Sequence, residues 1–238
     1  MLYCIRCLLP EETPSNEGIS RPIRTIIPEG TLVNATPQHA VSAGNVETSQ
    51  RITDVVLRSL ASALPDLIPA SSAGSMSNFT FGGITEEQSF AYYETIPGGS
   101  GGSPNIPGED GIQTHMTNTL NTPAEAIETD FPILIRNFSI RENSGGDGAQ
   151  PGGNGLIREI EFLTDLKASI VGDRRIKGAL GLNGGEDGLP AQDTYITVDG
   201  EENTLAGSAQ LHIKKGERLR IETPGGGGWG TKVKEEID

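Results

Sequence analysis

Hydrophobic residues in this chain fall mostly into short runs separated by turn residues, with one clear exception. From Asn45 onward they recur at helical spacing, and the run ends before Pro65. Asn45 or Thr48 can cap the free amides at its start. The positions on the apolar face are Ile52, Val55, Val56, Leu60, Ala63 and Leu64. This pattern predicts one long helix.

The other runs are typical of strands. Residues 1–34 alternate apolar pairs with proline, as in residues 23–30, which predicts strands joined by turns. Residues 89–94 predict a further strand, within a stretch from 69 to 121 that is too polar to pack throughout as regular elements. Thr122–Glu125 fits a capping box, with Pro123 at the first helical position, and predicts a short helix that ends before Pro132.

The second half of the chain has the pattern of a β-rich region. Its predicted strands are residues 133–140, 156–163, 167–171, 195–199, 209–214 and 218–222. In the last two runs, apolar and polar residues alternate on either side of Gly216, which predicts a hairpin buried on one face. His212 then points to solvent.

These elements define an α+β fold that is β-rich, with one long helix, a short helix and long glycine-rich loops. We divide the chain into a strand, helix and loop region (1–131), a β-rich region (132–231) and a charged tail (232–238) that we expect to be disordered.

Charge and composition narrow the function classes. The chain has 238 residues and carries 18 Lys and Arg against 32 Asp and Glu, a net charge of −14, so nucleic acid and anionic membrane surfaces should repel it. Its apolar runs are far shorter than the roughly 18 residues of a membrane span. The first six residues do not have the pattern of a secretory signal, so we expect a cytoplasmic protein.

Several motifs match catalytic patterns only formally. The chain has 32 glycines, and the GxSxG match at Gly98–Gly102 is not followed by a helix, so a flexible or ligand-covering loop is favoured over a hydrolase nucleophile. Gly225–Lys232 has the wrong residue order for a phosphate-binding loop. Cys4 and Cys7 form a CxxC pair without further nearby ligands, which disfavours zinc and redox chemistry and favours buried strand cysteines. We expect no cofactor or metal site on this chain alone.

Among the three histidines, His115 stands out. It lies in a segment of Thr and Asn residues, where an imidazole could move protons near neutral pH. The alternative is a hydrogen-bonded structural loop, since Asn and Thr often satisfy their own backbone.

Many phrases together resemble the hydantoinase B/oxoprolinase family, which includes N-methylhydantoinase B and related acetone carboxylase subunits. They occur in the same order along nearly the whole chain. The phrases are residues 3–10, 16–18, 21–23, 28–34, 44–52, 92–95, 115–119, 121–125, 143–146, 152–159, 173–175 and 222–228.

The resemblance covers only the C-terminal half of the B-type polypeptides of this family. It implies an ATP-dependent system in which a hydantoinase A-type ATPase subunit phosphorylates a cyclic amide and the B-type polypeptide completes its hydrolysis. ATP would then bind the partner, and a divalent metal would bind the N-terminal half of the B-type polypeptide, here a separate chain. The chain alone is not expected to be active.

For this half, the family-like loops suggest His115, Asn118 and Thr119 as catalytic residues of the substrate cleft, with Asn45 and Glu47 binding substrate. Asn45 could instead only cap its helix, and Glu47 only favour the helix N-terminus. The alternatives for the whole chain are a noncatalytic assembly fragment or remnant, a subunit of an acetone carboxylase-type enzyme, and an independent glycine-rich binding module.

Overall fold

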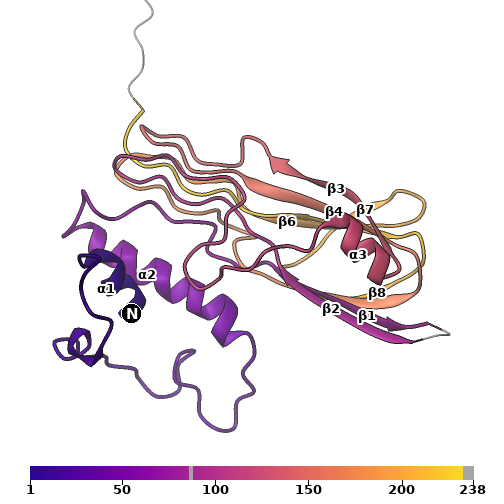
Figure 1. The fold of residues 1–238 in the computed structure, drawn as a ribbon, viewed down its shortest axis with the longest axis horizontal. Coiled ribbons are helices and arrows are strands. Elements are labelled where there is room, and N and C mark those ends of the chain that lie inside the picture. Colours follow the sequence, from indigo (N-terminus) through magenta and orange to yellow (C-terminus); the bar gives the residue numbers. More distant parts are fainter. Residues whose placement is uncertain (86–87, 233–238) are drawn as a thin grey trace, which may run out of the picture.

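The computed structural model describes residues 1–85 and 88–232, which form a β-sandwich with a helical region at one end (Figure 1). One sheet has four strands in the order β2-β1-β5-β8, and the other has five in the order β3-β4-β9-β6-β7, with antiparallel pairing throughout. The strands are β1 (Asn78–Ile84), β2 (Ser89–Thr95), β3 (Ile133–Arg141), β4 (Gly155–Phe162), β5 (Leu166–Val171), β6 (Gln192–Ile196), β7 (Glu202–Thr204), β8 (Ser208–Ile213) and β9 (Arg218–Glu222). The helices are α1 (Leu2–Leu8), α2 (Ser49–Ala61) and α3 (Ala124–Asp130), with a 3-10 turn at Glu17–Ile19 and a π-helical turn at Gly44–Thr48.

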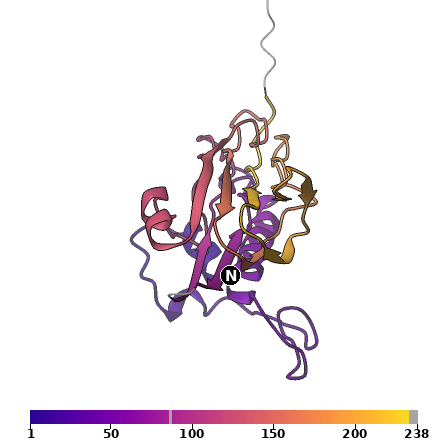
Figure 2. The ribbon, with the colours of Figure 1, turned by 90° about the vertical axis from the view of Figure 1, so that its right-hand side faces the viewer.

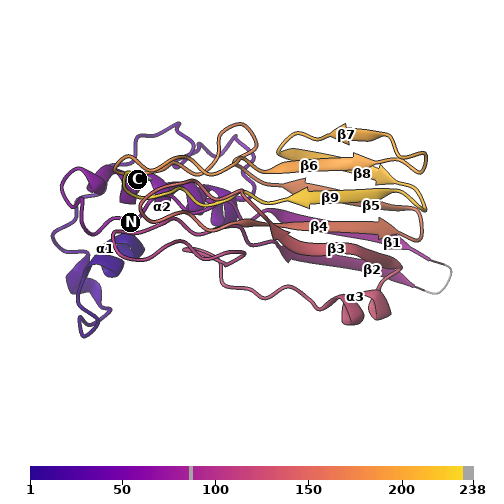
Figure 3. The same ribbon diagram turned by 90° about the horizontal axis from the view of Figure 1, so that it is seen from above.

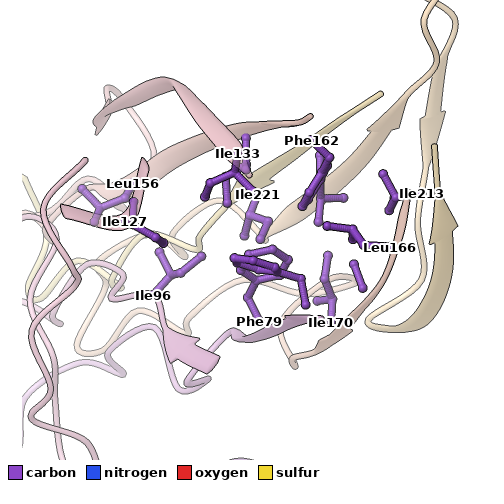
Figure 4. Close-up of a cluster of buried hydrophobic side chains, with 14 residues drawn as sticks. Phe79, Ile96, Ile127, Ile133, Leu156, Phe162, Leu166, Ile170, Ile213 and Ile221 are labelled. Carbon is purple, nitrogen blue, oxygen red and sulfur yellow. The ribbon is translucent and has the colours of Figure 1, made fainter. Parts of the chain in front are cut away.

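The main core fills the space between the two sheets (Figure 4). Apart from the exposed β7, the strands contribute inward-pointing residues to this core, such as Phe79 and Phe81 from β1 and Ile160 and Phe162 from β4. Ile127 of α3 closes one side of this core. Each such side chain contributes roughly 1.5–3 kcal/mol on burial, so the sandwich is the stable body that holds the loops.

The opening of the chain is a helix, and the predicted strands in residues 1–34 are wrong. α1 packs on α2 through Cys4 and Leu8, next to Leu57 and Ala61. A short apolar run does not distinguish a helix from a strand, and packing against α2 decides in favour of the helix. Cys4 is buried and Cys7 exposed, both on this helix, so the expected pair of buried strand cysteines is also wrong.

β8 and β9 do not form the predicted hairpin. β8 pairs with β5 in one sheet, whereas β9 pairs with β4 and β6 in the other. The chain crosses between the sheets near Gly216, whose φ of 88° lies in the left-handed region. A hairpin and two strands in facing sheets give the same alternation of apolar and polar residues. In both cases the apolar residues of β8 and β9 point into one core. His212 is exposed, as predicted.

The glycine-rich segments pack side by side in a layer that continues the sandwich toward the helices (Figure 3). We call residues 69–73, 98–102, 144–153, 178–188 and 224–230 the glycine bundle. Successive residues 226, 227 and 228 donate backbone hydrogen bonds to three different segments, at Gly153, Ser71 and Glu186 (2.8–2.9 Å). A period of three is that of a polyproline II-type helix rather than a strand.

This packing changes the interpretation of the two glycine motifs. Gly98–Gly102 is not a flexible loop, because its backbone bonds to the neighbouring segments and the Ser100 hydroxyl accepts the Glu109 N–H at 2.7 Å. Gly225–Gly228 is buried inside the bundle. Ser100 is therefore held as a structural residue.

Most remaining elements follow the predictions. α2 confirms the long helix, but neither Asn45 nor Thr48 caps it through a side chain, and α3 forms without the capping box. β6 lies a few residues earlier than expected, and β1 and β7 were not predicted. β1 belongs to the predicted region 1–131 and β5 to the predicted region 132–231, and the two strands pair in one sheet. The division of the chain at residue 131 stays a prediction. Residues 233–238 of the predicted tail lie outside the described residues.

Candidate functional site

The segment 113–122 leaves the glycine bundle and runs between α2 and the end of β2. The Gln50 side chain of α2 holds it in place, because its amide donates to the Thr114 carbonyl at 2.9 Å. The Gln50 side chain is buried although it is polar. Its hydrogen bond to Thr114 replaces the hydrogen bonds that it would make with water. The segment is thus fixed on both sides, with α2 on one and β2 on the other.

His115 lies against the two helices. Its Nδ1 is 3.2 Å from the Tyr3 hydroxyl of α1, and its backbone φ of 59° is in the left-handed region. Burial lowers the pKa of His115, although nearby Asp54 opposes this effect, and burial likewise raises the pKa of Tyr3 to about 12. The imidazole is therefore neutral at neutral pH and has one nitrogen that can accept a proton. It lines a cavity of about 10 Å³, room for about one water molecule.

Thr119 lies at the end of β2. Its hydroxyl is 2.5 Å from the Thr95 hydroxyl, and the Gln113 amide donates to Thr95 at 3.2 Å. Asn121 extends this network, donating to the Glu94 carboxylate at 2.9 Å. Asn118 is exposed between these contacts, and its side chain makes no hydrogen bond within the described residues.

Glu47 lies in the π-helical turn that precedes α2 and points toward the start of β1. One carboxylate oxygen accepts the Met76 N–H at 2.9 Å and the Asn78 side-chain amide at 2.7 Å. The other oxygen is buried and accepts no hydrogen bond within the described residues. Burial raises the pKa of Glu47, and Arg175 partly opposes this shift. Asn45, just before it in the same turn, is exposed and contributes only its carbonyl, to Ser49.

Asn78 connects these two groups, and sequence reasoning missed it. It pairs with Thr95 across β1 and β2, its amide reaches Glu47, and its carbonyl accepts the Tyr93 hydroxyl at 2.7 Å. Glu47 and Thr119 are therefore both bonded to one neighbouring pair of strand residues. His115 lies apart from them, on the α1 side, and Asn118 and Asn45 are not joined to either group. The polar start of β1, after Ser75 and Ser77, was the available signal.

A pocket of about 650 Å³ has both basic and apolar residues in its wall. Arg51, Arg174 and Arg175 line it, together with Asp173. Arg174 is buried and donates to Asp54 at 2.7 Å, and Arg175 is paired with buried Asp193 at 2.9 Å. The volume is within the range of small-molecule sites. These pairings hold the guanidinium groups rigidly at its wall.

The arrangement offers polar groups for recognition and one neutral base. No three His, Cys, Asp or Glu side chains lie close enough to hold a metal ion together in residues 1–85 and 88–232. The divalent metal that the resemblance implies therefore finds no ligand set in this part of the chain. A search of the same residues gives no helix long and apolar enough to cross a membrane.

Comparisons with known proteins agree with this fold. The model of the hydantoinase B/oxoprolinase family matches residues 1–232. The chain is 44% identical over 233 residues to 5-oxoprolinase 1 of Arabidopsis thaliana, covering 98% of this chain and 18% of that protein. It is 29% identical to the B component of a putative D-/L-hydantoinase of Pseudomonas sp., covering 94% of this chain and 38% of the relative.

Two solved structures share its architecture. The crystal structure of ATP-dependent caprolactamase from Pseudomonas jessenii superposes with a TM-score of 0.81 at 25% identity, over 97% of this chain and 42% of the caprolactamase chain. Nucleotide-free acetone carboxylase gives a TM-score of 0.59 at 16% identity, over 69% of this chain and 27% of its own, and shows the fold alone.

The fold is therefore shared with one portion of the caprolactamase and acetone carboxylase chains. The chain belongs to the hydantoinase B/oxoprolinase family, as its sequence suggested, and it spans about a fifth to two fifths of the relatives that it matches.

Proposed function

We propose that this chain is part of an ATP-dependent enzyme that opens a cyclic amide. The observation that carries the proposal is the family match over residues 1–232, together with the likeness to a caprolactamase over 97% of the chain. An unstrained cyclic amide is a poor electrophile. Phosphorylation of its oxygen by a partner ATPase supplies a leaving group and lowers the barrier to water attack.

In this proposal, the partners are a hydantoinase A-type ATPase subunit and a polypeptide equivalent to the N-terminal half of the B-type polypeptide. The Pseudomonas relative is named as one subunit of a hydantoinase, which supports a multisubunit assembly. The divalent metal that the family resemblance implies would bind this N-terminal half, and ATP would bind the ATPase subunit.

The role of this chain would be to shape the cleft and to move a proton. His115 is neutral and can accept the proton of the attacking water, while Thr119 and Asn118 offer hydroxyl and amide groups to a cyclic amide. Glu47 and Asn45 would border the cleft at the start of α2. The network through Asn78 and Thr95 fixes Glu47 and Thr119 relative to one another.

The test is an assay of the complete assembly, purified through a tag on this chain. We expect ring opening of a cyclic amide, among 5-oxoproline, hydantoin and caprolactam, that requires ATP and releases phosphate. Carboxylation of a ketone without amide hydrolysis would favour the acetone carboxylase-type alternative. An assembly that forms but has no turnover with any of these substrates would favour a noncatalytic fragment.

The His115→Ala substitution tests the site within that assembly. Loss of a general base lowers turnover roughly 10²–10⁴-fold, so we expect a fall of that order in kcat. His212→Ala, which changes an exposed histidine on β8, is the matched control and should leave kcat unchanged. Unchanged turnover of a correctly assembled His115→Ala enzyme would reject the cleft assignment.

A further inference from the structure

Residues 20–42, which we call the arm, form a segment of turns and extended backbone that lacks a core of its own. No residue of the arm is buried. Its backbone hydrogen bonds close local turns, such as those from Gly30 to Asn34 and from His39 to Thr36. Its longer-range contact is that of the Thr25 hydroxyl with the Met1 sulfur at 3.8 Å. In Figures 1 and 2 this part of the chain, in indigo and violet, extends away from the body of the protein.

The arm is nonetheless apolar. Leu32 is 83% exposed, Val41 76% and Ile26 73%, and Ile27 and Val33 are about half exposed. Its charged residues are two arginines and one glutamate, a net charge of +1 within a chain of net charge −14. Five exposed aliphatic side chains within a segment of sixteen residues are typical of a surface that another chain covers.

We propose that the arm is the docking surface for the polypeptide equivalent to the N-terminal half of the B-type polypeptide, the part of the Pseudomonas hydantoinase B component that this chain does not match. This inference rests on the proposed function and names the surface at which the assembly forms. The matches cover 97–98% of this chain but only 18% of the Arabidopsis oxoprolinase and 42% of the caprolactamase chain, so those proteins have ample additional chain to cover it.

Two other occupants fit less well. A second copy of this chain would bring the same charge of −14 to the contact, which opposes association. A membrane surface would need an amphipathic helix with a basic face, whereas the arm forms turns and carries two arginines only. A polypeptide that pairs apolar side chains with the arm satisfies both its composition and its extended shape.

The experiment is photo-crosslinking in the source cells. A benzophenone amino acid replaces Leu32 or Val41, and crosslinked products are identified by mass spectrometry. We expect a partner whose sequence aligns with the part of the Pseudomonas hydantoinase B component that this chain does not cover. Adducts only with the A-type ATPase subunit would overturn the proposal. Adducts with a second copy of this chain, with unrelated proteins, or with nothing would overturn the proposal.

A double substitution, Leu32→Ser with Val41→Ser, tests the same surface without a crosslinker. Because both side chains are exposed, far-UV circular dichroism and the unfolding midpoint should not change. Recovery of the partner should fall about tenfold or more, since each side chain would otherwise be buried in the complex. Ile84→Ser, at the far end of the sandwich, is the matched control, because Ile84 is 80% exposed and lies outside the arm. Equal recovery from the double variant and the wild type would contradict the proposal.

The outcomes are separable from those of the enzyme assay. An assembly that hydrolyses a cyclic amide but crosslinks through another surface would overturn the arm and leave the function standing. An assembly that crosslinks through the arm but has no activity would support the docking surface and overturn the proposed function.

Discussion

At the scale of single residues, the carboxyl group of Glu47 is the most unusual group of the candidate site. It is held by a backbone N–H and an amide, and its second oxygen is buried without a hydrogen bond within the described residues. Burial of a carboxylate under these conditions disfavours its charged form. Glu47 is therefore a group whose protonation and local structure are coupled.

This coupling predicts a pH dependence of stability. Because burial raises the pKa of Glu47 above its ordinary value of 4.5, its contribution is fully present below that value and is lost as pH rises through the folded-state pKa. The Glu47→Gln variant does not titrate here. We expect the unfolding free energy of the variant, relative to wild type, to improve as pH rises from about 4 to 7.

Urea denaturation at several pH values measures this difference. Glu29→Gln, at an exposed position in the arm, is the control. A difference between wild type and Glu47→Gln that does not change with pH would show that Glu47 is not titrating as described.

The buried ion pair of Arg158 and Glu94 gives a second prediction at this scale. Arg158 Nε lies 2.7 Å from the Glu94 carboxylate, both side chains are almost fully buried, and Arg158 also stacks over Phe138 at 4.7 Å. Removing one partner leaves a buried charge uncompensated. Glu94→Leu should lower the unfolding free energy by about 3–5 kcal/mol.

The double variant Glu94→Leu with Arg158→Met should lose less than Glu94→Leu alone, because no unpaired charge remains. Chemical denaturation of the wild type, both single variants and the double variant measures the coupling. Strictly additive losses would mean that the two charges do not depend on each other in the fold.

At the scale of elements, the glycine bundle is held by close backbone contacts. A Cβ added at Gly226 would overlap the Ser100 carbonyl, and one added at Gly152 would overlap the Gly226 carbonyl. Backbone atoms cannot turn aside as a flexible side chain can. Glycine is required at these positions because of close approach rather than because of an unusual backbone angle.

Substitution of Gly226 tests this requirement. Overpacking of this kind costs typically 1–3 kcal/mol, so Gly226→Ala should lower the unfolding free energy by at least that amount. Gly44→Ala is the matched control, since an added Cβ there meets no atom within 4 Å. Equal stability of the two variants would contradict the close packing of the bundle.

The elements also show why sequence reasoning succeeded in some places and failed in others. α2 was predictable because its apolar residues recur over several turns, and β3 and β4 because their runs are long. α1 was not, because seven residues give no period, and contact with α2 decided its structure. The pairing partners of β8 and β9 were not predictable, because the alternation of apolar and polar residues specifies a buried face and does not specify the neighbouring strand.

At the scale of the whole molecule, the sandwich and the arm should differ sharply in local stability. The strands of the sandwich are paired and enclose the main core, whereas the backbone of the arm is exposed and bonded only in local turns. Hydrogen exchange followed by mass spectrometry should therefore give the slowest exchange in β4 and β5 and near-complete exchange in the arm within seconds to minutes. Slow exchange in the arm of the isolated chain would mean that it is already covered.

The candidate site was only partly predictable for a reason that belongs to the whole molecule. The sequence singled out His115, Thr119 and Glu47, whose roles stay predictions, and the structure bonds Thr119 and Glu47 to neighbouring strand residues. Asn78, which joins them, lies some thirty residues after Glu47 and gains its position only when β1 and β2 pair. The polar residues before β1 mark the segment, but they do not show which residues Asn78 will contact once the strands have paired.

The glycine bundle also has a consequence for how this protein can vary. Every amino-acid replacement of glycine adds at least one carbon atom, so any missense change in a codon for Gly152 or Gly226 places that atom where a neighbouring carbonyl already lies. Every missense change in these two codons therefore creates a steric overlap with the backbone. The bundle therefore makes its glycine codons intolerant to point mutation, and sequence change is better accommodated in the strands, the loop at 113–122 and the surfaces around them.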